Sequence, residues 1–309
     1  MSSVYEITAP AKINIYLKVT GKLPNGYHRL NTIMQEISLS DSVVIDVDPS
    51  RAHDIELKCE NMGPIPNEKN LCYKAASRYL AAYRKKTGDL NLPFVSISVT
   101  KAIPSEAGLG GGSSDAAAVL LALDEFFENP FTPEELNTVA ANIGADTPFF
   151  LYGGASVCEG FGEIITPMNS LSGIPMVLIK PAKGVSTPAC FSSFDKFAEE
   201  NGIDFDEARY ASLKEEVSAA ENPISVLKKY RDLLVNDLQA PAIEYVPDIS
   251  IAKSLLEANG ATFALMSGSG SAVFGLFDNV ETRNKAFEVL SASKDVADKQ
   301  MKIYQCETC

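Results

Sequence analysis

Apolar and polar residues alternate along two stretches of the chain, which predicts two half-buried β-strands. Residues 12–19 place Ile, Ile, Leu and Val at the odd positions and Lys, Asn, Tyr and Lys at the even ones. Residues 95–99 place valine and isoleucine between serines. Because successive side chains of a strand point to opposite faces, Lys12 and Asn14 are expected to share one face.

Helical spacing of apolar residues predicts a second kind of element between the strands. Helices are expected at 70–86, 115–127, 132–142, 249–259 and 280–291, and further strands at 42–47, 153–157, 176–179, 264–266 and 272–277. Thr132-Pro133-Glu134-Glu135 has the form of a capping box. The polar stretch 195–223 matches no motif and is interpreted as helical or loop-like.

The predicted elements mix strands and helices, as in an α+β fold, and the length of the chain allows two domains or one large one. If there are two, we place the boundary near residue 165, where the residue pattern becomes less regular, giving residues 1–165 and 166–309. No internal repeat or low-complexity tract interrupts the chain.

Composition narrows the possible partners. The chain has 309 residues, 46% of them hydrophobic, which is enough to bury a large core. It has 40 acidic and 27 basic residues, a formal charge of -13 that disfavours nucleic acid and anionic membranes. No run approaches the ~18 apolar residues of a membrane span, and no leader is recognised, so a cytoplasmic protein is expected. The sequence carries no signal for an oligomeric state.

Cysteine and histidine offer little metal or redox chemistry. Among six cysteines only Cys306 and Cys309 form a close pair, and we expect that C-terminal pair to be frayed and without function. Sparse cysteines indicate a reducing compartment. The two histidines, His28 and His53, are too few for a histidine metal site, so no metal-ligating residues are predicted.

A glycine-rich loop lies between the strand at 95–99 and the helix at 115–127. It runs from Pro104 to Ser114 and contains Gly108, Gly110, Gly111, Gly112 and Ser113. Glycines let backbone amides approach an anion, and the following helix N-terminus attracts phosphate. A P-loop is excluded because no lysine follows the glycines, and a dinucleotide fingerprint is excluded by the spacing. The alternative is a flexible linker or tight turn.

Three segments resemble the GHMP kinases, a superfamily of ATP-dependent small-molecule kinases. They are residues 9–14, 104–117 and 267–274. The resemblance implies a ribosomal-protein-S5-like N-terminal domain and a ferredoxin-like C-terminal domain. Segments 11–17, 25–28 and 144–149 resemble the branch that acts in the non-mevalonate route to isoprenoids. That branch phosphorylates the 2-hydroxyl of the methylerythritol unit in a cytidine-containing diphosphate.

The resemblance implies catalytic roles for Asp146 and Lys12. Asp146 matches the aspartate that acts as general base, and Lys12 matches its lysine partner. A carboxylate near a hydroxyl accepts its proton in the transition state. Lys12 either orients that carboxylate or stabilises the transferring phosphoryl group, and the sequence leaves both roles open. From residue type alone, Asp146 is more typical of a helix cap and Lys12 of a solvated lysine.

The resemblance also implies two sets of binding residues. ATP, with Mg²⁺, is assigned to the glycine loop and to positions around the adenine, which are Asn70, Leu71 and Lys101. The acceptor is assigned to Asn14, Tyr27, His28, Phe191 and Ser269. Ser269 is either a second clamp near the phosphates or part of a tight hairpin. Asp115 either helps to hold Mg²⁺ or caps the helix.

Two other functions remain open at this stage. One is a kinase or ATP-dependent decarboxylase of the same superfamily with another acceptor, in which Tyr27 and His28 have no cytosine to hold. The other is a nucleotide-binding regulator without catalysis, against which the presence of both Lys12 and Asp146 argues.

Overall fold

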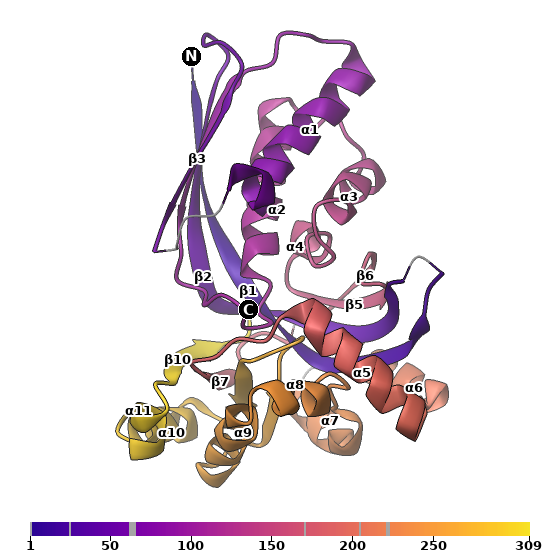
Figure 1. Cartoon of the computed structure of the whole chain (residues 1–309), viewed down its shortest axis with the longest axis vertical. Helices are drawn as coiled ribbons and strands as arrows, with labels where there is room; N and C mark the ends of the chain where they lie inside the picture. Colours follow the sequence, from indigo (N-terminus) through magenta and orange to yellow (C-terminus); the bar gives the residue numbers. More distant parts are fainter. Residues whose placement is uncertain (1, 25, 62–65, 170, 204, 221–222) are drawn as a thin grey trace. The chain divides into compact units, whose positions relative to one another are not determined.

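The computed structural model describes residues 2–309 except 25, 62–65, 170, 204 and 221–222 (Figure 1). It divides into two compact units. The first unit comprises residues 1–11, 39–103 and 110–153, and the second comprises residues 12–38, 104–109 and 154–309. The units are discontinuous in sequence, whereas the predicted boundary after residue 165 divides the chain once; that boundary stays a prediction.

Two long strands contribute residues to both units. They are β1 (Ser3–Lys22) and β2 (His28–Asp48), which pair with each other. In the first unit, β4 (Phe94–Thr100) runs antiparallel to β2, with Ser42 opposite Thr100. The unpredicted β3 (Ile55–Glu60) runs parallel to β4.

Helices pack against these strands in the first unit. They are α1 (Leu71–Thr87), α2 (Gly111–Phe126), α3 (Pro133–Ala141) and the short α4 (Phe149–Tyr152), with a 3₁₀ turn at Asn67–Lys69. Apolar residues of β2 and β4, such as Val43 and Val95, share one core with α1 and α2. The capping box at Thr132 is confirmed.

The start of α2 differs from the prediction. The helix begins at Gly111 instead of residue 115, so the last two glycines of the loop and both serines lie in its first turn. Gly110 is the N-cap and has a left-handed backbone with φ of +71°. Glycine adopts this conformation without steric cost, which explains how a glycine run can open a helix.

The second unit is built around an antiparallel sheet in the order β10-β7-β9-β8. Its strands are β7 (Pro175–Lys180), β8 (Phe263–Met266), β9 (Val273–Leu276) and β10 (Lys302–Glu307). In the same unit, residues 30–35 of β2 pair with β5 (Ala155–Gly160), which pairs with β6 (Ile164–Met168). The strand at 176–179 was predicted, but β6 and β10 were not.

The second unit also contains helices, which are α5 (Thr187–Asn201), α6 (Glu207–Ser218), α7 (Pro223–Lys229), α8 (Gln239–Tyr245), α9 (Asp248–Ala258), α10 (Val280–Ser291) and α11 (Lys294–Asp298), with a 3₁₀ turn at Arg231–Leu233. Residues of α5, α8, α9, α10 and α11 share a core with this sheet. The polar stretch 195–223 is therefore largely helical in its described part. None of the helices in the described ranges is long and apolar enough to cross a membrane.

Two expectations about burial are wrong. The strand at 12–19 is not half-buried, because most residues of its polar face are buried as well; Lys12 is 2% exposed and Asn14 is 1% exposed. The C-terminal tail is not frayed. Cys306 is buried in β10, and Thr308 N donates a hydrogen bond to Ile174 O at 3.1 Å.

Candidate active site

The polar face of β1 carries a chain of hydrogen bonds inside the second unit. The Lys12 ammonium donates to Asn14 Oδ1 at 2.5 Å. Asn14 Nδ2 donates to the Thr32 hydroxyl at 2.8 Å, and that hydroxyl donates to the Tyr16 carbonyl at 2.6 Å. A positive charge held where water is excluded attracts a nearby anion more strongly than it would in bulk water.

Segments that are far apart in the sequence meet beside Lys12. Ser267 Oγ donates to Gly108 O at 2.9 Å and accepts a hydrogen bond from Asn14 N at 3.3 Å. A Cβ added to Gly268 would lie 3.2 Å from Lys12 Nζ. The start of the glycine loop and the Gly-Ser-Gly segment of residues 268–270 therefore lie next to the lysine.

Gly108 is required by this close approach. Its φ of +73° is left-handed, and an added Cβ would lie 2.0 Å from Ser267 O. The two segments also pair through their backbones, since Ser271 N donates to Glu106 O at 3.2 Å and Ala272 N donates to Ala107 O at 3.1 Å. No side chain fits between them.

The first turn of α2, where the sequence predicts phosphate binding, lies within the first unit. Ser113 N and Ser114 N both donate to Gly110 O at 2.9 Å. A Cβ added to Gly112 would meet only Leu71 Cδ1, at 3.5 Å, so the Gly112 backbone is open to a ligand. The buried Ser114 hydroxyl has no hydrogen-bond partner among the described residues. Helix N-termini of this kind bind phosphate.

Two further predicted loop residues differ in their surroundings. A Cβ added to Gly111 would lie 2.9 Å from Ile103 Cγ2, so this glycine is needed for packing. Pro104 is partly buried and directly follows Ile103.

Asp146 lies on the turn between α3 and α4, also in the first unit. Thr147 N closes this turn by donating to Gly144 O at 3.0 Å. A Cβ added to Gly144 would lie 3.2 Å from Ser113 Oγ, so the turn packs directly against the first turn of α2. Asp146 is partly buried. The structure thus brings the predicted base close to the predicted phosphate loop.

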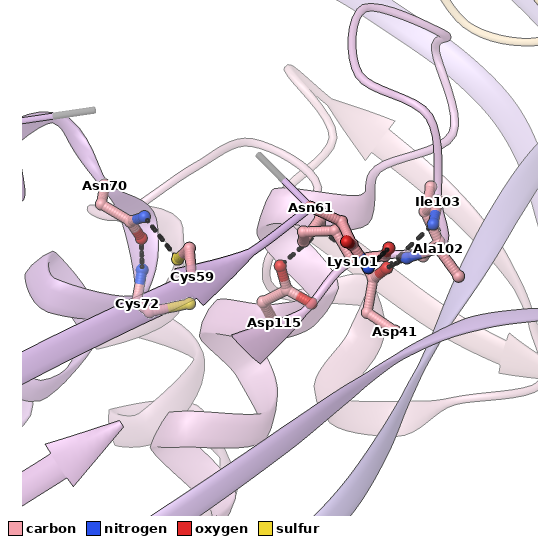
Figure 2. A network of polar contacts seen from close by, with 9 residues as sticks. All are labelled: Asp41, Cys59, Asn61, Asn70, Cys72, Lys101, Ala102, Ile103 and Asp115. Atoms are coloured by element: carbon pink, nitrogen blue, oxygen red, sulfur yellow. Dashed lines mark hydrogen bonds and ion pairs between the residues drawn. The ribbon is translucent and has the colours of Figure 1, made fainter. Parts of the chain in front are cut away.

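Lys101 lies between two carboxylates, as Figure 2 shows. Its ammonium donates to Asp41 Oδ2 and, at 2.6 Å, to Asp115 Oδ2. Asp41 Oδ1 also accepts hydrogen bonds from Ala102 N at 2.6 Å and Ile103 N at 2.8 Å. Asp115 belongs to the first turn of α2, so Lys101 connects the residues before the glycine loop with the helix after it.

The charges of this network are buried. Burial raises the pKa of Asp115 to about 7; the Lys101 ammonium opposes this shift and Asp41 adds to it. Burial alone would lower the pKa of Lys101, but the two carboxylates raise it, so the lysine is an ammonium at neutral pH. The second oxygen of Asp115, Oδ1, has no partner among the described residues.

Asn70 and Leu71 lie at the N-terminus of α1. Asn70 is the N-cap, because its Oδ1 accepts a hydrogen bond from Cys72 N at 2.9 Å. Its Nδ2 donates to Cys59 Sγ at 3.5 Å (Figure 2). Leu71 Cδ1 is the atom nearest to a Cβ added at Gly112. Asn70 and Leu71, two of the three residues predicted to lie around the adenine, therefore lie near the start of α2.

His28 is held by two residues of α5 in the second unit. The imidazole stacks on Phe191, with ring centroids 4.6 Å apart. His28 Nε2 lies 2.6 Å from Asp195 Oδ1, and Lys22 donates to Asp195 Oδ2 at 2.6 Å. The hydrogen bond from His28 contributes to a lowered pKa of Asp195, against the effect of burial. Phe191 and Asp195 are four residues apart, so they share one helix face.

The other two predicted acceptor residues also have neighbours in the second unit. Tyr27 is 57% exposed and its ring lies 5.2 Å from that of Phe161. The Ser269 hydroxyl lies 2.8 Å from the Thr187 hydroxyl at the start of α5. The exposed Tyr27 ring offers a face on which a base can stack.

Sequence reasoning missed several polar residues of the site. They are Thr32, Asp41, Asp195, Asn236 and Ser267. Asn236 Nδ2 donates to Met266 O at 2.8 Å and Gly268 O at 2.7 Å, which fixes the turn beside Lys12. Among these residues, Ser267 alone could have been found from the sequence, because it directly precedes the Gly-Ser-Gly segment. Each of the others lies on a segment without any motif.

The cysteines and acidic residues form no metal centre in the part of the chain that the structure describes. No group of three or more His, Cys, Asp or Glu side chains could hold a metal ion there. Cys306 and Cys309 are not joined in a disulfide, and burial raises the pKa of Cys306 to about 12. A thiol with so high a pKa is a poor nucleophile at neutral pH.

Comparison with protein families matches two models to this chain. The GHMP kinases N terminal domain matches residues 70–154, and the GHMP kinases C terminal domain matches residues 213–295. A 4-diphosphocytidyl-2-C-methyl-D-erythritol kinase of Desulfitobacterium hafniense is 38% identical over 284 residues, which are 91% of this chain and 89% of the relative. The enzyme of the same name from Geobacter metallireducens is 36% identical and covers 94% of this chain and 95% of the relative.

Comparison with solved structures also finds kinases. A crystal structure of 4-(cytidine 5'-diphospho)-2C-methyl-D-erythritol kinase has a TM-score of 0.73 and 31% identity, covering 99% of this chain and all of the other. Homoserine kinase from Cytophaga hutchinsonii also has a TM-score of 0.73, over 99% of this chain and 94% of the other. At 17% identity, this second likeness shows the fold alone.

Proposed function

This chain belongs to the GHMP kinases and, within them, to the 4-diphosphocytidyl-2-C-methyl-D-erythritol kinases, and we propose that it phosphorylates the 2-hydroxyl of 4-diphosphocytidyl-2-C-methyl-D-erythritol. It is a small-molecule kinase that uses ATP. The observation that carries the finer assignment is the stack of His28 on Phe191, with His28 Nε2 beside Asp195, because this pair can hold the cytosine that distinguishes the acceptor.

ATP is assigned to the first turn of α2. The left-handed Gly110 and the open Gly112 let the triphosphate approach backbone N–H groups, and the positive end of the helix dipole attracts it. Asn70 and Leu71 lie next to that turn, which supports their assignment to the adenine. The Lys101 side chain is bound to Asp41 and Asp115, so we assign it to holding the loop.

Mg²⁺ fits the residues at the same turn. Kinase sites usually hold Mg²⁺ through one or two protein groups together with phosphates and water. The Ser114 hydroxyl and Asp115 Oδ1 are buried and lack partners among the described residues, so they are the atoms that would hold it. When bound, the ion supplies positive charge that neutralises the phosphate oxygens.

Asp146 is assigned the role of general base. The acceptor hydroxyl oxygen forms a bond to the γ-phosphorus while the bond to the β,γ-bridging oxygen breaks, and ADP leaves. The proton of the hydroxyl passes to the Asp146 carboxylate. Lys12, with its direction set by Asn14, balances the negative charge of the carboxylate or of the phosphoryl group. This mechanism requires Asp146 and Lys12 to reach the same substrate.

The cytosine of the acceptor is assigned to Tyr27, His28 and Phe191. The exposed Tyr27 ring and the stacked pair His28 and Phe191 offer aromatic faces. Base stacking contributes roughly 1–3 kcal/mol for each base. Asn14 is assigned to the methylerythritol unit and Ser269 to a clamp near the phosphates.

An acceptor panel with an Asp146 variant tests the proposal. ADP release should occur with the cytidine-containing acceptor and not with mevalonate or homoserine. Asp146→Asn should lower kcat by about 10²- to 10⁴-fold, the usual contribution of a general base. The matched control, Asp298→Asn on the exposed end of α11, should retain wild-type turnover. Turnover with mevalonate alone would exclude the proposed acceptor, and full activity of Asp146→Asn would exclude the proposed base.

A further inference from the structure

Thr32 is a fully buried polar residue of β2, with an exposed fraction of 0%. Its hydroxyl makes two hydrogen bonds within the second unit. It donates to the Tyr16 carbonyl at 2.6 Å and accepts from Asn14 Nδ2 at 2.8 Å. Neither partner belongs to β2, so Thr32 links that strand to the polar face of β1.

The two bonds leave one possible orientation for the Asn14 amide. A hydroxyl has a single proton, and Thr32 uses it for the Tyr16 carbonyl. Only its lone pairs then face Asn14, which must present its NH₂ group to Thr32. The carbonyl oxygen of the same amide consequently points to Lys12, whose ammonium donates to it at 2.5 Å.

The backbone of Asn14 is fixed independently. Its N–H donates to Ser267 Oγ at 3.3 Å, and Ser267 in turn donates to Gly108 O. With the backbone fixed, rotation of the amide by 180° is the main freedom left to the side chain. An inverted amide would place an NH₂ group against the Lys12 ammonium, where two donors have no acceptor between them.

We propose that Thr32 is a positioning residue of the kinase reaction: its hydroxyl fixes the Asn14 amide and thereby aims the Lys12 ammonium. The inference rests on the proposed function, because it assumes that Lys12 acts on the reacting groups. Small errors in the placement of such a group are costly, since a misplacement of about 1 Å can lower the rate by a factor of about 10².

Replacement of Thr32 by valine tests this role. Thr32→Val keeps the size of the side chain and removes its hydroxyl, so Asn14 Nδ2 loses its acceptor. We expect kcat to fall by about 10- to 100-fold, with the KM for ATP unchanged. Thr32→Ser, which retains the hydroxyl, should restore most of the lost turnover. If Thr32→Val does not fold, Thr32→Ala removes the same hydroxyl without placing a second methyl group against the Asn14 amide and gives the same comparison.

Thr308→Val is the matched control for stability. The Thr308 hydroxyl has the same pattern, because it donates to Leu171 O and accepts from Ile174 N at 2.9 Å, and the residue is 2% exposed. Its partners are not assigned to the reaction. Thr308→Val should therefore lower the thermal midpoint about as much as Thr32→Val does, while kcat stays at the wild-type value.

A double-mutant cycle with Lys12→Met separates this inference from the proposed function. If Thr32 acts through Asn14 and Lys12, Thr32→Val should cause no further loss of kcat in the Lys12→Met background. If Lys12→Met is inactive but Thr32→Val is fully active, the role of Thr32 is overturned and the kinase assignment stands. Lys12→Met with wild-type turnover would overturn the role of Lys12 itself. Inactivity of Thr32→Ser would show that the hydroxyl is not what matters.

Discussion

Gly108→Ala should destabilise the second unit strongly. The added Cβ would lie 2.0 Å from Ser267 O and 2.9 Å from Gly270 N, both of them backbone atoms. Two backbone segments would have to separate by about 1.5 Å to restore ordinary contact distances. That movement would break the hydrogen bond from Ser267 Oγ to Gly108 O, which is 2.9 Å long.

The size of the effect follows from two contributions. A left-handed backbone costs a residue with a Cβ about 1–2 kcal/mol, and Gly108 has a φ of +73°. Overpacking of a buried site typically costs a further ~1–3 kcal/mol. The sum of about 2–5 kcal/mol corresponds to a fall of roughly 4–20 °C in the thermal midpoint.

Gly112→Ala is the matched control in the same loop. Its added Cβ would meet only Leu71 Cδ1 at 3.5 Å, which is an ordinary contact. Alanine also favours a helix over glycine by about 1 kcal/mol, so this variant should melt at or above the wild-type temperature. If phosphate approaches the Gly112 backbone, however, the new methyl group should raise the KM for ATP.

Thermal melting and the KM for ATP, measured for both variants, test the steric role of Gly108 and the phosphate site at Gly112. We expect Gly108→Ala to melt early and Gly112→Ala to melt normally with a raised KM for ATP. A wild-type midpoint for Gly108→Ala would refute the steric reasoning. A wild-type KM for ATP in a stable Gly112→Ala would contradict the assignment of phosphate to this turn.

Three further variants test other parts of the structure. Burial raises the pKa of Glu36 above its value in the unfolded chain. The contribution of Glu36 to the free energy of unfolding therefore falls as the pH rises from the unfolded-state pKa to the folded-state pKa, by at most about 1.4 kcal/mol per pH unit. Glu36→Gln should remove this fall in denaturant titrations at pH 4 to 8. Lys101→Met leaves buried carboxylates without their cation and should cost about 3–5 kcal/mol in the same assay. Asp195→Asn weakens the hold on His28 and should raise the KM for the acceptor several-fold, with the KM for ATP unchanged; an equal rise in both would contradict it.

The elements with strong periodicity were predictable from the sequence. The helix at 280–291 has the predicted bounds, and β4 extends the predicted strand by one residue at each end. The missed strand β3 does alternate, because Ile55, Leu57 and Cys59 lie between charged residues, so its pattern was overlooked. The missed strand β10 lacks a clear alternation of exposed and buried positions. The tail of residues 302–309 was misjudged for the same reason, since its order comes from pairing with β7.

Motifs located the candidate site but did not reveal how it is held together. Lys12, Gly108 and Ser269 lie in segments whose residue types already indicate phosphate chemistry. Thr32 and Asp41 lie in strand β2, where a threonine or an aspartate is not unusual. Their importance arises from partners on other strands and loops, and such long-range contacts leave no trace in local spacing.

Identification of the reaction product tests the central claim most directly. Phosphorus NMR should follow the protein with ATP, Mg²⁺ and 4-diphosphocytidyl-2-C-methyl-D-erythritol. The account predicts one new phosphomonoester resonance on the acceptor for each ADP formed, with the diphosphate bridge to cytidine intact. ADP and free inorganic phosphate without a phosphorylated acceptor, or no reaction with this acceptor at all, would contradict it.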